Sequence, residues 1–218
     1  RSTRGSSPAG QVPASFAQAM LGLRAKYSPQ SLAVACSGGL DSMVLLRLAH
    51  DWCAREGISL WVFHVHHGLS PRSDDWLAHV EGAAGELGVG VDHRRVTIPN
   101  DGSGIEAAAR KLRYAALGEM CRAHGATLLL TAHHLDDQAE TVLLQLLRGS
   151  GLAGLSGMDA DNRAPGLLGD GELAMARPLL AQSRAALEAF ALEHGLGWVE
   201  DESNQDPRYT RNALRHQV

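Results

Sequence analysis

Cysteine is scarce in this sequence of 218 residues, and no segment is long and apolar enough to suggest a membrane span. The three cysteines lie far apart and form no C-x-x-C pair, which excludes a disulfide framework and a cysteine-based structural zinc site. A membrane helix would need about 20 consecutive apolar residues. These absences predict a soluble protein of the reducing cytoplasm that has no membrane partner.

An excess of positive charge is also missing. The formal net charge is -4 and the sequence pI is about 6.3, so contact with a nucleic acid would have to come from a local patch. Only Lys26 and Lys111 are lysines among the 20 basic residues. Arginine favours forked contacts with phosphate or carboxylate, although a codon-composition bias explains the preference equally well.

The order of the apolar runs predicts the fold. Short apolar runs alternate with helix-length segments, as in right-handed βαβ units. We therefore expect an α/β fold, a doubly wound and mostly parallel sheet with helices on both faces. Residues 1–13 are expected to form a flexible tail and residues 14–218 one domain with a helical extension from about residue 183. The expected strands are 31–36, 59–66, 89–98 and 126–132, the expected helices are 41–56, 71–87, 104–124, 135–148 and 184–194, and residues 150–170 are expected to form a glycine-rich loop.

A candidate phosphate site follows the first expected strand, with the sequence Ser37, Gly38, Gly39, Leu40, Asp41, Ser42. The glycines allow close approach of the backbone, and the N–H groups of the first helical turn point at an anion. No lysine follows the glycines, so the pattern differs from a Walker loop. The alternative is an ordinary strand-to-helix turn in which Asp41 complements the helix dipole.

An acidic cluster follows the fourth expected strand and begins with the pair His133 and His134. Asp137 and Glu140 stand three residues apart and share a helical face, and Asp136 precedes them. The set fits a pocket for a cationic substrate or a site for Mg²⁺ beside ATP phosphates, with zinc as a further alternative. In the plainest alternative, the acids only complement the helix N-terminus.

Further candidates lie on a strand and on a helix. Alternation places His64 and His66 on one face of the strand 59–66, where one histidine can be a buried core residue and the other can line a nucleotide cleft. Arg110 and Arg113 share a face of the helix 104–124. They could form surface pairs with acids such as Glu106 or contact phosphates or RNA.

These segments resemble one family. The S-G-G-x-D-S pattern at Ser37 is similar to that of the PP-loop ATP pyrophosphatases, which have a Rossmann-like fold of the adenine nucleotide alpha hydrolase type. The longer matches resemble the tRNA(Ile)-lysidine synthetases from about residue 31 onward. They are H-V-H-H-G-L-S at His64, G-I-E-A-A-A-R-K-L-R-Y at Gly104, A-H-H-L-D-D-Q-A-E-T at Ala132, R-P-L-L at Arg177 and R-N-A-L-R-H at Arg211.

The resemblance implies a ligase that forms a C–N bond. ATP would adenylate the C2 oxygen of the wobble cytidine of tRNA(Ile) with a CAU anticodon, and free L-lysine would then displace AMP. It implies ATP and Mg²⁺ at the phosphate site with His64 and His66 nearby, lysine at Asp137 and Glu140, and Mg²⁺ at Asp41 and Asp136. The implied catalytic residues are Asp41, Arg110, His133, Asp137 and Arg211.

Two other functions stay open. A PP-loop tRNA thiolase would need cysteines that carry a persulfide or bind a cluster, and no paired cysteines exist here. A non-catalytic nucleotide-binding module could share the fold, although the acidic cluster would then have no role. The family's C-terminal tRNA-binding domains are absent from this sequence, so we expect weak tRNA binding by these residues alone. The resemblance also allows a homodimer.

Overall fold

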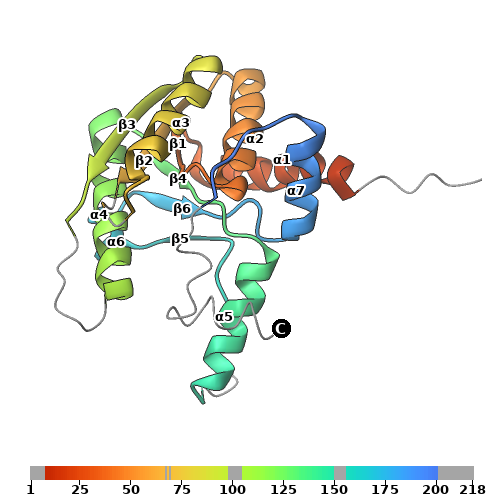
Figure 1. Cartoon of the computed structure of the whole chain (residues 1–218). Coiled ribbons are helices and arrows are strands. Elements are labelled where there is room, and N and C mark those ends of the chain that lie inside the picture. Colours follow the sequence, from red (N-terminus) through yellow and green to blue (C-terminus); the bar gives the residue numbers. More distant parts are fainter. Residues whose placement is uncertain (1–7, 67, 69, 98–104, 150–155, 201–218) are drawn as a thin grey trace, which may run out of the picture.

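The computed structural model describes residues 8–66, 68, 70–97, 105–149 and 156–200. Six strands form one sheet in the order β3-β2-β1-β4-β6-β5 (Figure 1). All neighbouring strands are parallel except β5, which is antiparallel to β6. The predicted fold class is therefore confirmed. The strands are β1 (Ser31–Ala35), β2 (Ser59–His66), β3 (Gly90–Arg95), β4 (Leu128–Leu130), β5 (Asp161–Arg163) and β6 (Ala174–Ala176).

Helices cover both faces of the sheet because side chains alternate along each strand. On β1, Leu32 and Val34 join one core cluster and Ala33 joins the other. Residues of α1 (Pro8–Tyr27), α2 (Leu40–Glu56), α3 (Ser73–Glu86) and α7 (Arg184–Glu193) pack into the first cluster. Residues of α4 (Ile105–His124) and α6 (Pro165–Leu168) pack into the second. No helix within the described ranges is long and apolar enough to cross a membrane.

The predicted boundary of the N-terminal tail is wrong by several residues. Helix α1 begins at Pro8, and Ala9 and Val12 are buried within the first core cluster. They extend the helical spacing of the apolar residues that follow, and this burial outweighs the missing hydrogen bond at the exposed Pro13. Residues 1–7 lie outside the described part of the chain.

The glycine-rich loop predicted for residues 150–170 is also corrected in part. Residues 161–163 form strand β5 and residues 165–168 form the short helix α6. Strand β6 was not predicted, because its residues, Ala-Met-Ala, include no β-branched or aromatic residue that would indicate a strand. Residues 150–155 lie outside the described residues.

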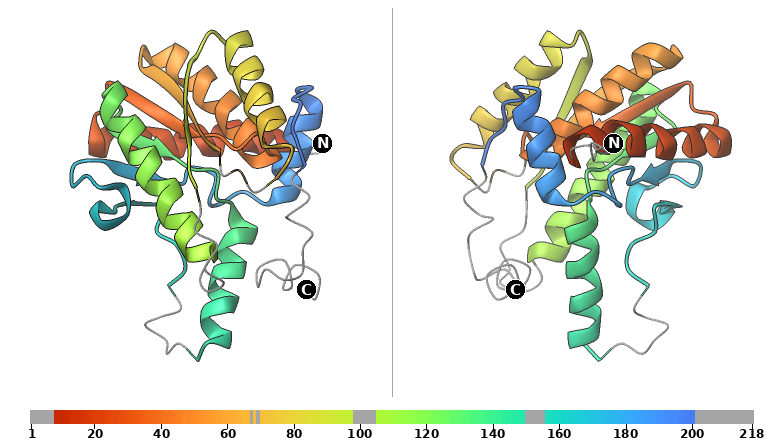
Figure 2. Two further views of the ribbon diagram at one scale, coloured as in Figure 1. Left: turned by 60° about the vertical axis from the view of Figure 1, so that its left-hand side comes forward. Right: turned by 90° about the vertical axis from the view of Figure 1, so that its right-hand side faces the viewer.

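The strand order determines where a ligand can bind. The chain runs from β1 to β2 on one side, and β4 pairs with β1 on the other side. In such sheets, ligands bind beyond the carboxyl ends of the strands at this point of reversal. Helix α5 (Leu135–Leu147) follows β4 there and projects away from the sheet (Figure 2).

Candidate active site

The phosphate loop connects β1 to α2 at the carboxyl edge of the sheet. Ser42 Oγ accepts the N–H of Ser37 at 3.2 Å and donates to the carbonyl oxygen of Gly39 at 2.9 Å. Gly38 has a φ of +89°, and a Cβ at this position would lie 3.1 Å from Val199 Cγ2. The first N–H groups of α2 lack acceptors within the helix. The loop is therefore shaped to bind an anion at the N-terminus of α2.

His134 lies between the phosphate loop and the start of α5. Its side chain is 3% exposed, and its Nε2 lies 3.6 Å from Asp41 Oδ2 and 3.5 Å from Asp137 Oδ2. Its Nδ1 lies 3.5 Å from Asp136 Oδ2. Burial lowers the pKa of His134, but the close contact with Asp41 and the charges of Asp41, Asp136 and Asp137 outweigh burial, so the pKa is raised. The buried His134 side chain thus connects the acids of α5 to the phosphate loop.

The three acids of α5 have different surroundings. Asp136 Oδ2 accepts the N–H of Arg184 at 2.9 Å and so caps the start of α7. Asp137 Oδ2 accepts the N–H of His134 at 3.1 Å and so caps α5 itself. Glu140 is partly buried and lies beyond the first turn, where the field of the helix terminus has fallen off. The helix-terminus alternative thus explains part of what Asp136 and Asp137 do, but it does not explain Glu140.

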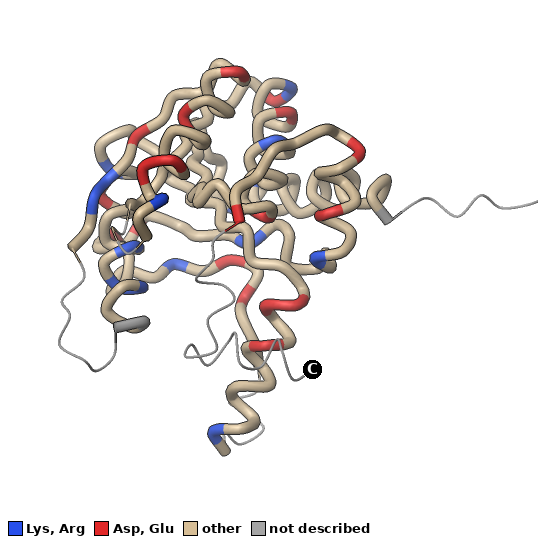
Figure 3. Tube along the Cα trace, viewed as in Figure 1, with Lys and Arg blue, Asp and Glu red and all other residues tan. Residues whose placement is uncertain are grey.

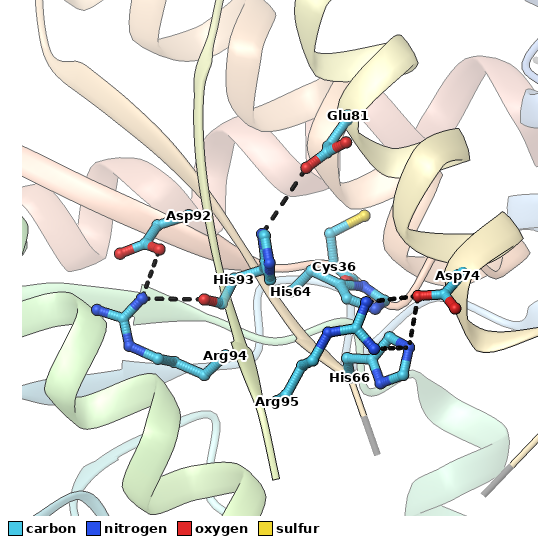
Figure 4. A network of polar contacts seen from close by, with 9 residues as sticks. All are labelled: Cys36, His64, His66, Asp74, Glu81, Asp92, His93, Arg94 and Arg95. Atoms are coloured by element: carbon cyan, nitrogen blue, oxygen red, sulfur yellow. Dashed lines mark hydrogen bonds and ion pairs between the residues drawn. The ribbon is translucent and has the colours of Figure 1, made fainter. Parts of the chain in front are cut away.

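The two histidines of β2 form different contacts, which Figure 4 shows with the surrounding network. His64 Nδ1 lies 2.9 Å from the carbonyl oxygen of Cys36, so this nitrogen carries the proton and donates. Burial lowers the pKa of His64 and favours its neutral form. His66 Nε2 lies 3.2 Å from Asp74 Oδ1 and 3.3 Å from the guanidinium of Arg95. Both histidines are buried, and the partner of His64 directly precedes the phosphate loop.

Charged groups of opposite sign lie on different elements of this edge. Figure 3 shows acidic residues on the first turns of α5 and basic residues at the end of β3.

Three arginines, two on α4 and one directly after β6, have defined contacts. On α4, the guanidinium carbons of Arg110 and Arg113 lie 4.9 Å and 5.2 Å from the ring centre of Tyr114. Arg177, which directly follows β6, is buried and donates to the carbonyl oxygen of Asp159 at 2.7 Å. Burial lowers the pKa of Arg177, and the charge of Arg110 lowers it further.

Asp41 carries the oxygen that best fits a divalent cation. Its Oδ1 is buried and has no hydrogen-bond partner. Mg²⁺ beside a nucleotide takes one or two carboxylates together with phosphate oxygens and water, and this atom lies at the anion-binding end of α2. In residues 8–66, 68, 70–97, 105–149 and 156–200, no group of three or more His, Cys, Asp or Glu side chains is placed to hold a metal ion. This part of the chain therefore offers no ready zinc site.

The structure brings most of the predicted residues to one edge of the sheet. His133 follows β4, and its Nδ1 lies 3.0 Å from Thr131 Oγ1. Arg211 lies outside the described residues. Sequence reasoning singled out His133 of the histidine pair and missed the role of His134. The position of His134, three residues before Asp137, has the spacing of a capping box and could have indicated this role.

Comparison with known sequences places the chain among related proteins. A family model described as a PP-loop domain matches residues 13–218. The chain is 52% identical over 188 residues to a tRNA(Ile)-lysidine synthase from Burkholderia mallei, covering 86% of this chain and 37% of the relative. A protein of the same name from Bordetella bronchiseptica is 48% identical over 196 residues, covering 88% of this chain and 55% of the relative. The chain thus spans about a third to a half of the length of these curated relatives.

Solved structures share the fold at low sequence identity. A U34-tRNA thiolase from Methanococcus maripaludis has a TM-score of 0.70 and 16% identity, covering 95% of this chain and 72% of that chain. An NMN synthetase from Francisella tularensis has a TM-score of 0.55 and 13% identity, covering 88% of this chain and 72% of that chain. These likenesses concern the arrangement of helices and strands.

Proposed function

Because the chain belongs to the PP-loop domain family, we propose that it binds ATP and acts as a tRNA(Ile)-lysidine synthetase. In this reaction the C2 oxygen of the wobble cytidine of tRNA(Ile) with a CAU anticodon attacks the α-phosphorus of ATP, and pyrophosphate leaves. The ε-amino nitrogen of free L-lysine then attacks C2, and AMP leaves with that oxygen. The names of the relatives at about 50% identity support this choice of substrates.

One observation carries the proposal. His134 Nε2 lies 3.6 Å from an oxygen of Asp41 in the phosphate loop and 3.5 Å from an oxygen of Asp137 on α5. An anion-binding turn and an acidic turn therefore meet at one buried histidine. A site that activates a base with ATP and then receives a cationic amine needs the phosphate-binding turn and the acidic turn close together, so that both can reach the reacting base.

The proposed roles follow from these positions. Residues 37–42 would bind the phosphates of ATP, and Asp41 would hold Mg²⁺, which neutralises charge on the leaving pyrophosphate when it is bound. Asp136 is a weaker magnesium candidate, because its Oδ2 already accepts a backbone N–H. His64 and His66 would line the nucleotide site.

The acids of α5 would bind the amine. The ε-amino group of lysine has an ordinary pKa of about 10.4, so it arrives as an ammonium ion and must lose a proton before it attacks. Asp137 and Glu140 would hold the ammonium group, and a carboxylate of this pair would accept its proton. Arg110, His133 and Arg211 would contact the nucleotide and the activated base.

The thiolase alternative finds less support. Cys36 and Cys53 lie in one core cluster and Cys121 in the other, on the opposite face of the sheet. All three cysteines are buried, and burial raises the pKa of Cys53 and Cys121 to about 12. Sulfur transfer needs accessible thiolates. We also propose a cytoplasmic location, where tRNA substrates occur, and the resemblance allows a homodimer.

The products of ATP test the proposal. The protein is incubated with ATP, Mg²⁺, radiolabelled lysine and isoleucine tRNA, and we expect AMP, pyrophosphate and labelled tRNA in equal amounts. Asp41→Ala should abolish all three products, because it removes the proposed ligand of Mg²⁺. Stoichiometric ADP and orthophosphate would refute the assignment.

A further inference from the structure

Helix α5 is held to the rest of the domain mainly near its N-terminus. It contains no buried residue and projects from the carboxyl edge of the sheet (Figures 1 and 2). At the first turn, the N–H of Leu135 donates to the carbonyl oxygen of Gln182 at 2.8 Å, and Asp136 caps α7. These contacts fix one side of the first turn. The direction in which the helix leaves the sheet then depends on the second turn.

Gln138 fixes the second turn through both ends of its side-chain amide. Its Nε2 donates to the carbonyl oxygen of Met158 at 2.8 Å, and its Oε1 accepts the N–H of Met158 at 2.6 Å. The side chain therefore pairs with one backbone residue as a neighbouring strand would. Because two bonds must align at once, this contact fixes the orientation of α5 as well as its distance from the segment 157–162.

The partner segment is itself anchored to the sheet. Arg177 at the end of β6 donates to the carbonyl oxygen of Asp159 at 2.7 Å and to Asn162 Oδ1 at 2.9 Å. Gly157 has a φ of +68°, and a Cβ there would lie 2.8 Å from Gln138 Oε1. The close contact therefore requires glycine at this position. A continuous series of hydrogen bonds therefore connects Arg177, at the end of β6, through residues 157–162 to Gln138.

We propose that Gln138 is a positioning residue that holds Asp137 and Glu140 in place for the amine substrate. It lies between them in sequence, one residue after Asp137 and two residues before Glu140. Gln138 acts through these carboxylates and does not contact lysine. The inference rests on the proposed function, since lysine is the amine. We call the contact of Gln138 with Gly157 and Met158 the α5 clamp. The inference adds that binding of the amine requires this clamp.

Two variants break the α5 clamp from opposite sides. Gln138→Ala removes both hydrogen bonds, and Gly157→Ala pushes the amide away. Each should raise the KM for lysine about 10-fold, because two neutral hydrogen bonds that orient the carboxylates are lost. Release of pyrophosphate from ATP and tRNA without lysine should stay within about 2-fold, since the phosphate loop is untouched. The double variant should have the same KM for lysine as Gln138→Ala, because the steric conflict with the amide is then gone and only the strain of alanine at a φ of +68° is added.

Gln145→Ala is the matched control. Gln145 lies two turns further along α5, and its Oε1 has no hydrogen-bond partner. This variant should leave the KM for lysine unchanged. Hydrogen exchange gives a readout without substrates: the amides of α5 should exchange about 10-fold faster in Gln138→Ala than in Gln145→Ala, while those of α2 should not change.

The outcomes separate the two proposals. If the unmodified protein does not use lysine, the proposed function fails and this inference fails with it. If the unmodified protein uses lysine but Gln138→Ala keeps its KM, the positioning role alone is refuted. A parallel loss of pyrophosphate release and lysine use in Gln138→Ala would also refute it, because that result indicates general damage to the fold.

Discussion

Asp137 offers a test that separates amine binding from folding. Its Oδ2 caps α5 by accepting the N–H of His134 at 3.1 Å, and its side chain is only 13% exposed. Asp137→Asn keeps an oxygen acceptor for that N–H and removes the charge. A charged hydrogen bond is worth about 1.5–3 kcal/mol, so the KM for lysine should rise about 10- to 100-fold. Asp137→Ala should add a loss of about 1 kcal/mol in the free energy of unfolding, the usual cost of a lost cap.

Lysine-dependent AMP formation and denaturant unfolding measure the two effects on the same preparations. Glu140→Gln is the companion variant, because Glu140 lies beyond the capping turn. It should raise the KM for lysine by a similar factor with little change in unfolding. If Asp137→Asn and Glu140→Gln both kept their dependence on lysine, the cluster would have a metal-binding or structural role, and the reasoning from charge would be wrong.

Four further predictions concern stability and ATP binding. Gly118→Ala should destabilise the domain by several kcal/mol, because a Cβ there would lie 1.9 Å from the carbonyl oxygen of Leu168. Gly82→Ala on α3 meets no atom within 4 Å and should instead stabilise by up to about 1 kcal/mol in the same unfolding assay. Gly38→Ala should weaken ATP binding in calorimetry, since φ is +89° and Val199 blocks the space; unchanged affinity would contradict the proposed loop geometry. The pKa of His64 is lowered on folding, so its contribution to stability is lost as pH falls below its ordinary value of 6.5, where only the unfolded chain takes up the proton. Acid unfolding should therefore be less steep in His64→Gln than in the unmodified protein.

Much of the fold could be predicted because the short apolar runs of the sequence mark its buried strands. The strand 59–66 has the predicted limits, and α2 and α4 begin within one residue of the predicted starts. Strands β5 and β6 could not be found, since neither contains a β-branched or aromatic residue and each is defined by pairing with a neighbour. The start of α1 was hidden by serine, glycine and proline, although its apolar stripe continues to Ala9.

The candidate site was predicted to the extent that its residues follow strands. Asp41 and Asp137 could be assigned to the same edge because β1 and β4 both end there. The part played by His134 could not be predicted, because it depends on a contact between the loop after β1 and the loop after β4. Gln138 was missed for the same reason, since its partner Met158 lies in a segment expected to be an irregular loop.

The two edges of the sheet also bear on how copies of the protein can associate. Exposed strand edges invite pairing with another chain, and charged residues on a short edge strand oppose it. Strand β5 has only three residues, two of them charged, and β3 ends with two arginines. Continuation of the sheet from one copy into the next is therefore disfavoured on both sides. A dimer of this chain would have to pack through helices or loops, and its formation would not depend on backbone pairing.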